Sequence, residues 1–210
     1  MLARNLRLLA LMAVLAGGAA AFLSGGVRGV GDHTGFAPAQ PIAFSHRLHA
    51  GEMQIACLYC HAGAERSRHA GIPEASLCMN CHRVVTAPRD AMAQELLRAQ
   101  AEQREPRPVV SAKLAKLYRA LGLDDRLAPD PSLAPRPVAW TRVHDLPDFV
   151  HFDHRPHVLG GVACETCHGP VQSMERVRQE RDLSMGWCVD CHRANRAATP
   201  AATDCVTCHF

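Results

Sequence analysis

The sequence has few aromatic residues and no cysteine outside one repeated pattern. Phe, Trp and Tyr together make up 5% of its 210 residues, so large aromatic side chains can contribute little to a core. No basic run is interleaved with aromatic residues, so nothing indicates nucleic-acid binding. No Ser/His/Asp arrangement, phosphate-binding loop or carboxylate pair stands out as a catalytic site. These absences leave cysteine and histidine as the residues that carry chemistry.

The ten cysteines form five copies of Cys-x-x-Cys-His. Positions i, i+3 and i+4 project from the same face of a helical turn. The two thiols can therefore bond the vinyl groups of a haem while the histidine reaches its iron. The pattern predicts five covalently attached haem c groups, with the five histidines as proximal ligands. In chain order the copies are Cys57, Cys60 and His61; Cys78, Cys81 and His82; Cys164, Cys167 and His168; Cys188, Cys191 and His192; and Cys205, Cys208 and His209.

Zinc and disulfides are the alternative uses of paired cysteines. The gaps from Cys60 to Cys78 and from Cys167 to Cys188 both suit a zinc site. However, zinc does not require a histidine after each second cysteine, and here all five pairs have one. A disulfide framework fits an even number of cysteines in an exported chain, but it does not impose one spacing on all ten. Haem attachment is therefore the interpretation that we prefer.

The length of the chain limits the fold class. Five haems leave 42 residues for each, too few for five separate cores of side chains. The fold class that we predict is mostly α and irregular, a multihaem cytochrome c with short helices and loops wrapped around five packed haems. One N-terminal transmembrane helix is expected, and little β-structure. The chain has 21 arginines and two lysines, and we expect some of the arginines to hold haem propionates.

The N-terminal residues 1–28 read as a membrane segment. Arg4 and Arg7 precede an uncharged run, residues 8–27, that is just long enough to span a bilayer. The leading arginines favour a cytoplasmic N-terminus. We expect a retained anchor, a tether at 29–42 and a haem domain on the periplasmic side of the cytoplasmic membrane. A cleaved signal peptide is the alternative, because residues 19–21 are all alanine.

An internal repeat divides the rest of the chain. Phe44-x-His46-x-x-His49 precedes the first haem motif, and Phe152-x-His154-x-x-His157 precedes the third at nearly the same distance. The predicted domains are a first two-haem module at 43–84, a helical connector at 85–140 and a three-haem module at 141–210. The last combines the second His-x-x-His module with the C-terminal haem.

The connector is expected to contain two helices, at 90–104 and 111–121. The second has an apolar face formed by Leu114, Leu117, Tyr118 and Leu121. This face could pack onto the haem domain or dock a partner subunit. Packing onto the haem domain is the simpler expectation.

Eight histidines remain after the five proximal ones are counted. The repeated pairs predict His46, His49, His154 and His157 as distal iron ligands. The two histidines of a pair cannot easily serve one iron, so each pair is expected to bridge two neighbouring haems. For the fifth distal ligand the first choice is His144, and Met185 is the main alternative, with Met174 behind it. The difference matters because Met/His ligation gives a higher reduction potential than bis-His ligation.

These motifs, taken in order, resemble those of a known family. The sequence Phe-Ser-His-x-x-His precedes Cys-Leu-Tyr-Cys-His and Cys-Met-Asn-Cys-His, and the segment from His144 to His157 precedes Met-Gly-Trp-Cys-Val-Asp-Cys-His. This combination resembles the pentahaem c-type cytochrome subunit of alternative complex III, and more distantly the multihaem class III, cytochrome c3/c7-like proteins. The resemblance covers nearly the whole chain. It implies histidine as the distal ligand at positions 46, 49, 144, 154 and 157.

The resemblance also implies a function and a set of partners. The chain would be an electron-transfer subunit, not itself an enzyme, of a membrane quinol:electron-acceptor oxidoreductase in the respiratory chain. Its partners would be an iron–sulfur subunit and quinol-binding integral membrane subunits, with a monohaem cytochrome c or an oxidase as acceptor.

Two other functions remain open from the sequence. A soluble periplasmic electron shuttle of the cytochrome c3 type is favoured if the N-terminal segment is cleaved. A multihaem reductase would need one iron with an open coordination position. The eight spare histidines and seven methionines argue against that reductase, because they can easily fill five distal positions.

Overall fold

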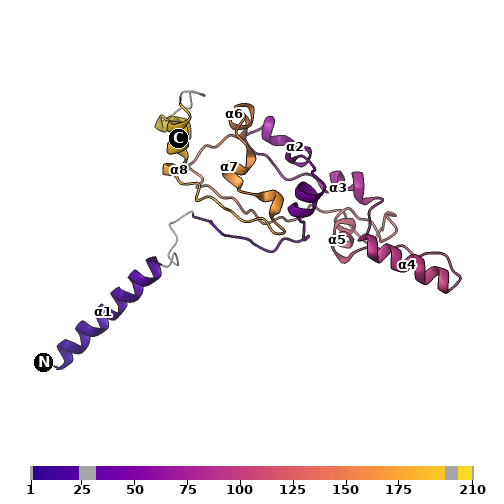
Figure 1. The fold of residues 1–210 in the computed structure, drawn as a ribbon, viewed down its shortest axis with the longest axis horizontal. Helices are drawn as coiled ribbons and strands as arrows, with labels where there is room; N and C mark the ends of the chain where they lie inside the picture. Colours follow the sequence, from indigo (N-terminus) through magenta and orange to yellow (C-terminus); the bar gives the residue numbers. More distant parts are fainter. Residues whose placement is uncertain (1, 24–31, 197–202, 210) are drawn as a thin grey trace.

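The fold consists of short helices joined by irregular segments (Figure 1). The computed structural model describes residues 2–23, 32–196 and 203–209. Its α-helices are α1 (Leu2–Leu23), α2 (Cys57–Cys60), α3 (Ala75–His82), α4 (Arg89–Ala101), α5 (Ala112–Ala120), α6 (His154–Leu159), α7 (Cys164–His168), α8 (Met185–Ala194) and α9 (Cys205–Cys208). A π-helix, η1 (Arg47–Glu52), and two 3₁₀ turns, η2 (Ala62–Glu65) and η3 (Val171–Ser173), complete the described elements.

The described residues form isolated β-bridges but no regular β-strand. These bridges pair Thr34 with Gln179, Leu123 with Pro129, and Val150 with His209. The prediction of a mostly helical and irregular fold with little β-structure is therefore confirmed.

The N-terminal helix differs from the expected membrane anchor. Helix α1 is 22 residues long and ends at Leu23, whereas the uncharged run in the sequence continues to residue 27. No helix within residues 2–23, 32–196 and 203–209 combines the length and the apolar character needed to cross a membrane. The expected transmembrane helix is thus not found, and the last residues of the run lie outside the described part of the chain.

The core of protein side chains is small. Among the described residues the buried apolar side chains are Ala64, Ala87, Ala99, Ala115, Leu117, Tyr118 and Met174. Four of these seven are alanines, and many larger apolar side chains are exposed. Side chains alone therefore bury little apolar surface, as expected for so few residues per motif.

The connector forms both helices that the sequence predicts. Helix α4 begins one residue before the predicted start and ends three residues before the predicted end, while α5 begins after its capping residue Ser111. The Ser111 hydroxyl accepts a hydrogen bond from the backbone N–H of Leu114 at 3.3 Å. Leu117 and Tyr118 are buried, and the Tyr118 hydroxyl donates to the carbonyl of His82 at 2.6 Å. The apolar face of α5 therefore packs within the chain, against the end of α3.

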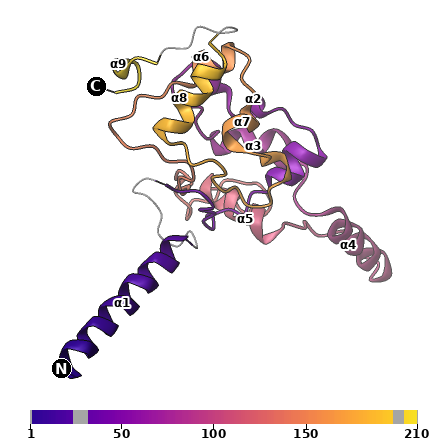
Figure 2. The same cartoon turned by 60° about the vertical axis from the view of Figure 1, so that its left-hand side comes forward.

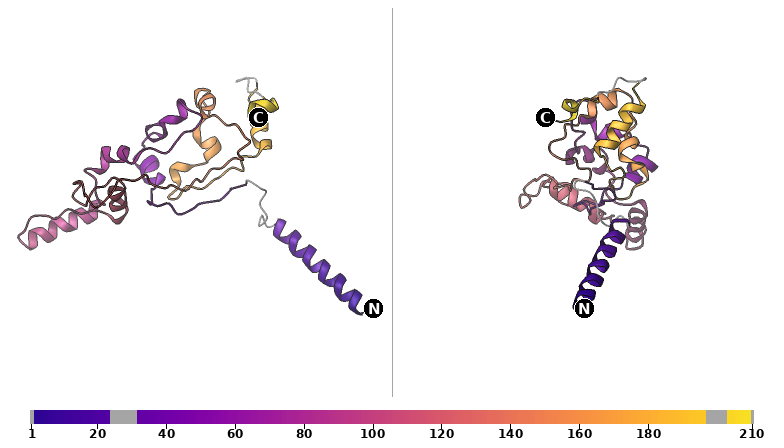
Figure 3. Two further views of the ribbon diagram at one scale, coloured as in Figure 1. Left: turned by 180° about the vertical axis from the view of Figure 1, so that it is seen from behind. Right: turned by 90° about the vertical axis from the view of Figure 1, so that its left-hand side faces the viewer.

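The haem-motif helices lie in a row that differs from their chain order. Figure 1 shows α8, α7, α2 and α3 following one another along the body, with α5 below α3 and α4 extending beyond both. The reverse view in Figure 3 shows the same succession. Figure 2 places α9 beside α8, at the end opposite α4.

Candidate haem-binding sites

Each pair of cysteines lies on its own short helix. The motifs fall on α2, α3, α7, α8 and α9, with the cysteines one turn apart. All ten cysteines are described, and none forms a disulfide. Burial is the largest cause that raises the pKa of Cys167, to about 11, so this thiol is protonated at neutral pH. In the described part of the chain, no three His, Cys, Asp or Glu side chains form a ready-made ion site.

Cys81 of the second motif and Cys191 of the fourth are each fixed by hydrogen bonds to their backbone carbonyl. The carbonyl of Cys81 accepts from the N–H groups of Val84, at 3.0 Å, and Val85, at 2.9 Å. The carbonyl of Cys191 accepts from the backbone N–H of Asn195 at 3.1 Å and from its side-chain amide at 2.9 Å. Cys81 is exposed and Cys191 is half-buried. The backbone of both residues is thus held in place, and both side chains are accessible for bonding to a haem.

The two histidines of the first repeat face two different proximal histidines. The ring of His46 lies 6.5 Å from that of His61, measured between centroids, and the ring planes are nearly parallel at 4°. The ring of His49 lies 6.1 Å from that of His82, with an angle of 62°. Both distal candidates come from the short π-helix η1 and its first flanking residue. One element thus serves the first and second motifs.

The second repeat has the same geometry. The ring of His154 lies 6.3 Å from that of His168 with an interplanar angle of 6°. The ring of His157 lies 6.0 Å from that of His192 with an angle of 32°. Both distal candidates come from α6. In each repeat, therefore, the first histidine faces the nearer motif and the second faces the next one.

These four separations suit two imidazoles that coordinate one iron from opposite sides. An imidazole nitrogen lies about 2 Å from a bound transition metal, and the centroid of the ring lies roughly 1 Å further away. The centroids of two such rings are then about 6 to 6.5 Å apart across the metal. A direct ring stack would be closer, as in the 4.3 Å contact between Phe44 and His49.

The far nitrogen of most of these rings is held by a backbone carbonyl. The Nδ1 acceptors are Ser45 O for His49 (2.8 Å), Gly71 O for His61 (2.7 Å), Val85 O for His82 (2.8 Å), Arg68 O for His154 (2.7 Å) and Asp153 O for His157 (2.8 Å). A carbonyl can only accept, so Nδ1 carries the proton and Nε2 keeps its lone pair. This anchoring is the arrangement that metal-binding histidines usually have.

Two rings of the first and third sites are buried enough to stay neutral. Burial is the largest cause that lowers the pKa of His46 to about 4, and the neighbouring His61 adds to the effect. Burial likewise lowers the pKa of His168 to about 4. A neutral imidazole is the form that binds a metal.

The repeated phenylalanine orients each pair of histidines. Phe44 meets His46 edge-on at 4.8 Å while it stacks on His49. Phe152 meets His154 edge-on at 4.8 Å and lies 4.8 Å from His157. The sequence revealed this phenylalanine as part of the repeat but gave it no role.

His144 lies at a proximal histidine instead of facing a motif of its own. Its Nε2 is 3.2 Å from Nδ1 of His168, and the two rings are 4.3 Å apart at 79°. Burial lowers the pKa of His144 to about 4, so it is neutral and can accept the Nδ1 proton of His168. Met185, the alternative ligand, is 69% exposed at the start of α8.

The fifth motif is held by the segment that precedes α6. Val150 and His209 form an antiparallel bridge, and the backbone N–H of His151 donates to the carbonyl of Cys208 at 2.7 Å. The ring of Phe149 lies 5.8 Å from that of His209. The identity of the distal ligand at this site stays a prediction.

Arg68 contributes to the third site although no sequence motif marks it. The carbonyl of Arg68 accepts two hydrogen bonds from His154, one from its backbone N–H at 3.2 Å and one from its ring Nδ1–H at 2.7 Å. Its own Nε is buried and finds no hydrogen-bond partner among the described residues. A buried guanidinium nitrogen without a partner suits the carboxylate of a haem propionate. The residues present therefore fit haem c in their thiols, imidazoles and anion-binding groups.

Comparison with known proteins gives two matches. Residues 150–210 match the family described as Cytochrome c7 and related cytochrome c. The chain is also 23% identical over 192 residues to the multiheme cytochrome c subunit of menaquinone reductase from Nitratidesulfovibrio vulgaris, a match that covers 81% of this chain and 76% of that protein. The chain is thus similar in sequence to multihaem c-type cytochromes.

Proposed function

We propose that the chain carries five haem c groups, one at each Cys-x-x-Cys-His motif. The observation that carries this proposal is the 6.0–6.5 Å separation repeated in four pairs of histidine rings. When bound, each haem supplies an iron that alternates between the ferrous and ferric states and so carries one electron. Four of the haems would have two histidine ligands, in the pairs His46 with His61, His49 with His82, His154 with His168, and His157 with His192.

The fifth haem would be attached through Cys205 and Cys208, with His209 as its proximal ligand. His144 and Met185 are the candidates that the sequence offers for its distal ligand, and the contact of His144 with His168 supports a different role for His144. At the third site, His144 would accept a hydrogen bond from the Nδ1–H of the proximal His168 and so hold that imidazole in place. Arg68 would bind a propionate between the first and third sites.

The chain would act as the electron-transfer subunit of a membrane quinone oxidoreductase. The relative from N. vulgaris, a subunit of a menaquinone reductase, supports this assignment. The finer assignment to an alternative complex III rests on the order of the sequence motifs. It would place the haem domain on the outer face of the cytoplasmic membrane. There it would contact an iron–sulfur subunit and quinol-binding membrane subunits, with a monohaem cytochrome c or an oxidase as acceptor.

The experiment that tests this role compares the native assembly with the isolated chain. The protein should purify from membranes as part of a larger complex, in which menaquinol reduces its haems. The isolated holoprotein should be reduced by dithionite but not by menaquinol, because the quinol-binding site would belong to the membrane subunits of the complex. Rapid reduction of the isolated chain by menaquinol would contradict the subunit role.

A soluble electron shuttle is the second candidate function, and the match of residues 150–210 to the cytochrome c7 family supports it. A shuttle would be recovered in the periplasmic fraction as a free chain that still carries five haems. Recovery in that form, with no association with other subunits, would decide for the shuttle.

A further inference from the structure

The two His-x-x-His modules hold each other in place. In the first module, η1 packs against η3 from the second. The backbone N–H of Arg47 donates to the carbonyl of Met174 at 2.9 Å, and the Ser45 hydroxyl donates to the Glu175 carboxylate at 2.5 Å. Gly51 lies so close to a carbonyl of this segment that a Cβ atom would collide with it. The segment after the third motif thus supports the histidines of the first repeat.

The reverse contact has the same form. Helix α6, which carries the histidines of the second repeat, packs against η2, which follows the first motif. The carbonyl of Arg68, a few residues further on, accepts both hydrogen bonds from His154. Each repeat is therefore supported by the segment after the other module's first motif. Such reciprocal packing brings the first and third motifs together.

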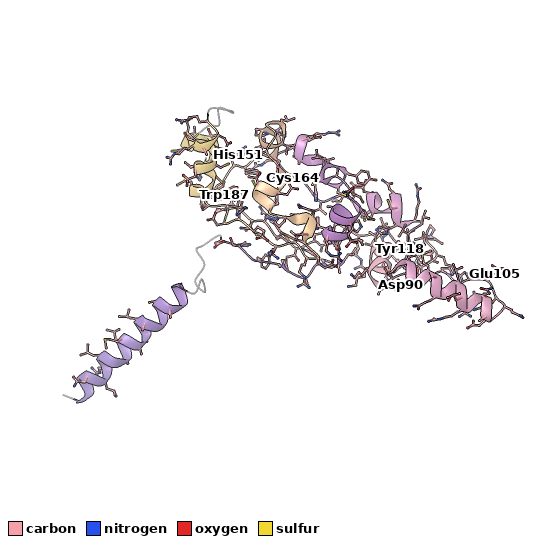
Figure 4. The ribbon with its side chains drawn as sticks, viewed as in Figure 1. Asp90, Glu105, Tyr118, His151, Cys164 and Trp187 are labelled. Atoms are coloured by element: carbon pink, nitrogen blue, oxygen red, sulfur yellow. The ribbon has the colours of Figure 1, made fainter. Side chains whose placement is uncertain are left out.

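The helices that carry these two motifs, α2 and α7, are neighbours in the row (Figures 1 and 3). Figure 4 labels Cys164 in the middle of the body, with Trp187 and His151 toward one end and Tyr118 toward the other. The junction between the modules is therefore central, and the second and fourth motifs lie on its two sides.

Contacts on either side fix the remaining neighbours. The first and second motifs are joined by the hydrogen bond from the Asn80 side chain to the Tyr59 hydroxyl, at 2.9 Å, and by the shared η1 element. The third and fourth share α6. At the far end, α9 lies beside α8 (Figure 2), which puts the fifth motif beside the fourth.

We propose that the five haem sites are arranged in the spatial order second, first, third, fourth, fifth, with the reciprocal packing of the two modules at the contact between the first and third. This inference rests on the proposed function, because it concerns where the motifs would hold their haems. The second and fifth sites are then the two ends of the row. Partner proteins that exchange electrons with the chain would bind near α3 and near α9, and the first motif in the sequence would lie inside.

The test locates the irons in the native holoprotein. Anomalous diffraction at the iron edge gives the iron positions, and electron density for the thioether bonds assigns each iron to its motif. The expected result is a row in which the irons of the first and third motifs are neighbours and those of the second and fifth are terminal. A row in chain order, with the second iron between the first and third, would overturn the proposal.

Two matched variants make the assignment independent of the density for the thioether bonds. Cys78→Ala combined with Cys81→Ala removes the second haem, and Cys57→Ala combined with Cys60→Ala removes the first. The first variant should lose an iron at one end of the row, and the second an iron from its interior. The opposite pattern would refute the proposed order. If a variant does not fold, the native iron positions decide alone. A native protein with fewer than five irons would instead count against the proposed function.

Discussion

Replacement of His157 by alanine should leave one haem of the five without its distal ligand. The His157 ring is 6.0 Å from that of His192 and its Nδ1 is anchored to the carbonyl of Asp153. The other three distal candidates face other proximal histidines, so their pairs should be unaffected. The variant loses the iron–nitrogen bond and also the anchoring hydrogen bond, which contributes about 0.5–1.5 kcal/mol. The haem would stay attached through Cys188, Cys191 and His192, so the variant should remain folded, with its other four haems unchanged.

The assay is electron paramagnetic resonance of the fully oxidised protein, together with absorption in the high-spin charge-transfer region. One haem in five should become high-spin, which is about a fifth of the total haem signal. His69→Ala is the matched control, because this exposed histidine lies near the first motif and is not expected to bind iron. The control should stay fully low-spin.

Two results would refute the reasoning. An unchanged low-spin spectrum in His157→Ala would mean that His157 does not bind iron, and two high-spin haems would mean that the pairs are not independent. His157→Met adds a second check, since Met/His ligation raises the reduction potential relative to bis-His. One haem of that variant should therefore titrate at a higher potential and remain low-spin.

The remaining predictions concern three side chains outside the paired ligands. His144→Phe removes the acceptor of the His168 Nδ1–H and so makes the His168 imidazole less basic. All five haems should stay low-spin, while the reduction potential of one haem rises in a redox titration. A new high-spin haem would instead identify His144 as a distal ligand. Tyr118→Phe removes the hydroxyl that donates to the carbonyl of His82, so denaturant unfolding should show a loss of about 0.5–1.5 kcal/mol; no loss would contradict the packing of α5. The hydrogen bond from Arg104 is the largest cause that lowers the pKa of Glu95 to about 2. The stabilisation that ionised Glu95 gives to the end of α4 is therefore complete above about pH 4.5 and is lost as the pH falls through 2. The hydrogen-exchange protection factors of this turn should fall over that range in the wild type but not in Glu95→Gln.

The sequence predicted the candidate haem-binding residues because the chemistry of haem attachment constrains them locally. Cysteine spacing and the following histidine must fit within one helical turn, so the five motifs were visible directly. The repeat also predicted that each His-x-x-His pair faces two different motifs, and the ring geometry is consistent with this. The two helices of the connector could be predicted because Ser111 and Gly122 mark the limits of α5.

What could not be predicted depends on contacts between segments far apart in the chain. The role of Arg68 comes from its backbone carbonyl, which any residue would have, and from a hydrogen bond to a residue 86 positions away. The contact of His144 with His168 is also tertiary. The position of His144 in the sequence, just before the second module, indicated only that it could be a further distal ligand. The row of motifs depends on the reciprocal packing of η1 with η3 and of α6 with η2, which no local pattern encodes.

The most direct test of the central claim is the mass of the native protein under denaturing conditions, measured together with its iron and zinc content. The expected result is a polypeptide that carries five covalently attached haems, with five irons and no zinc for each chain. A chain with fewer than five covalent haems, or with zinc bound at the cysteine pairs, would contradict it.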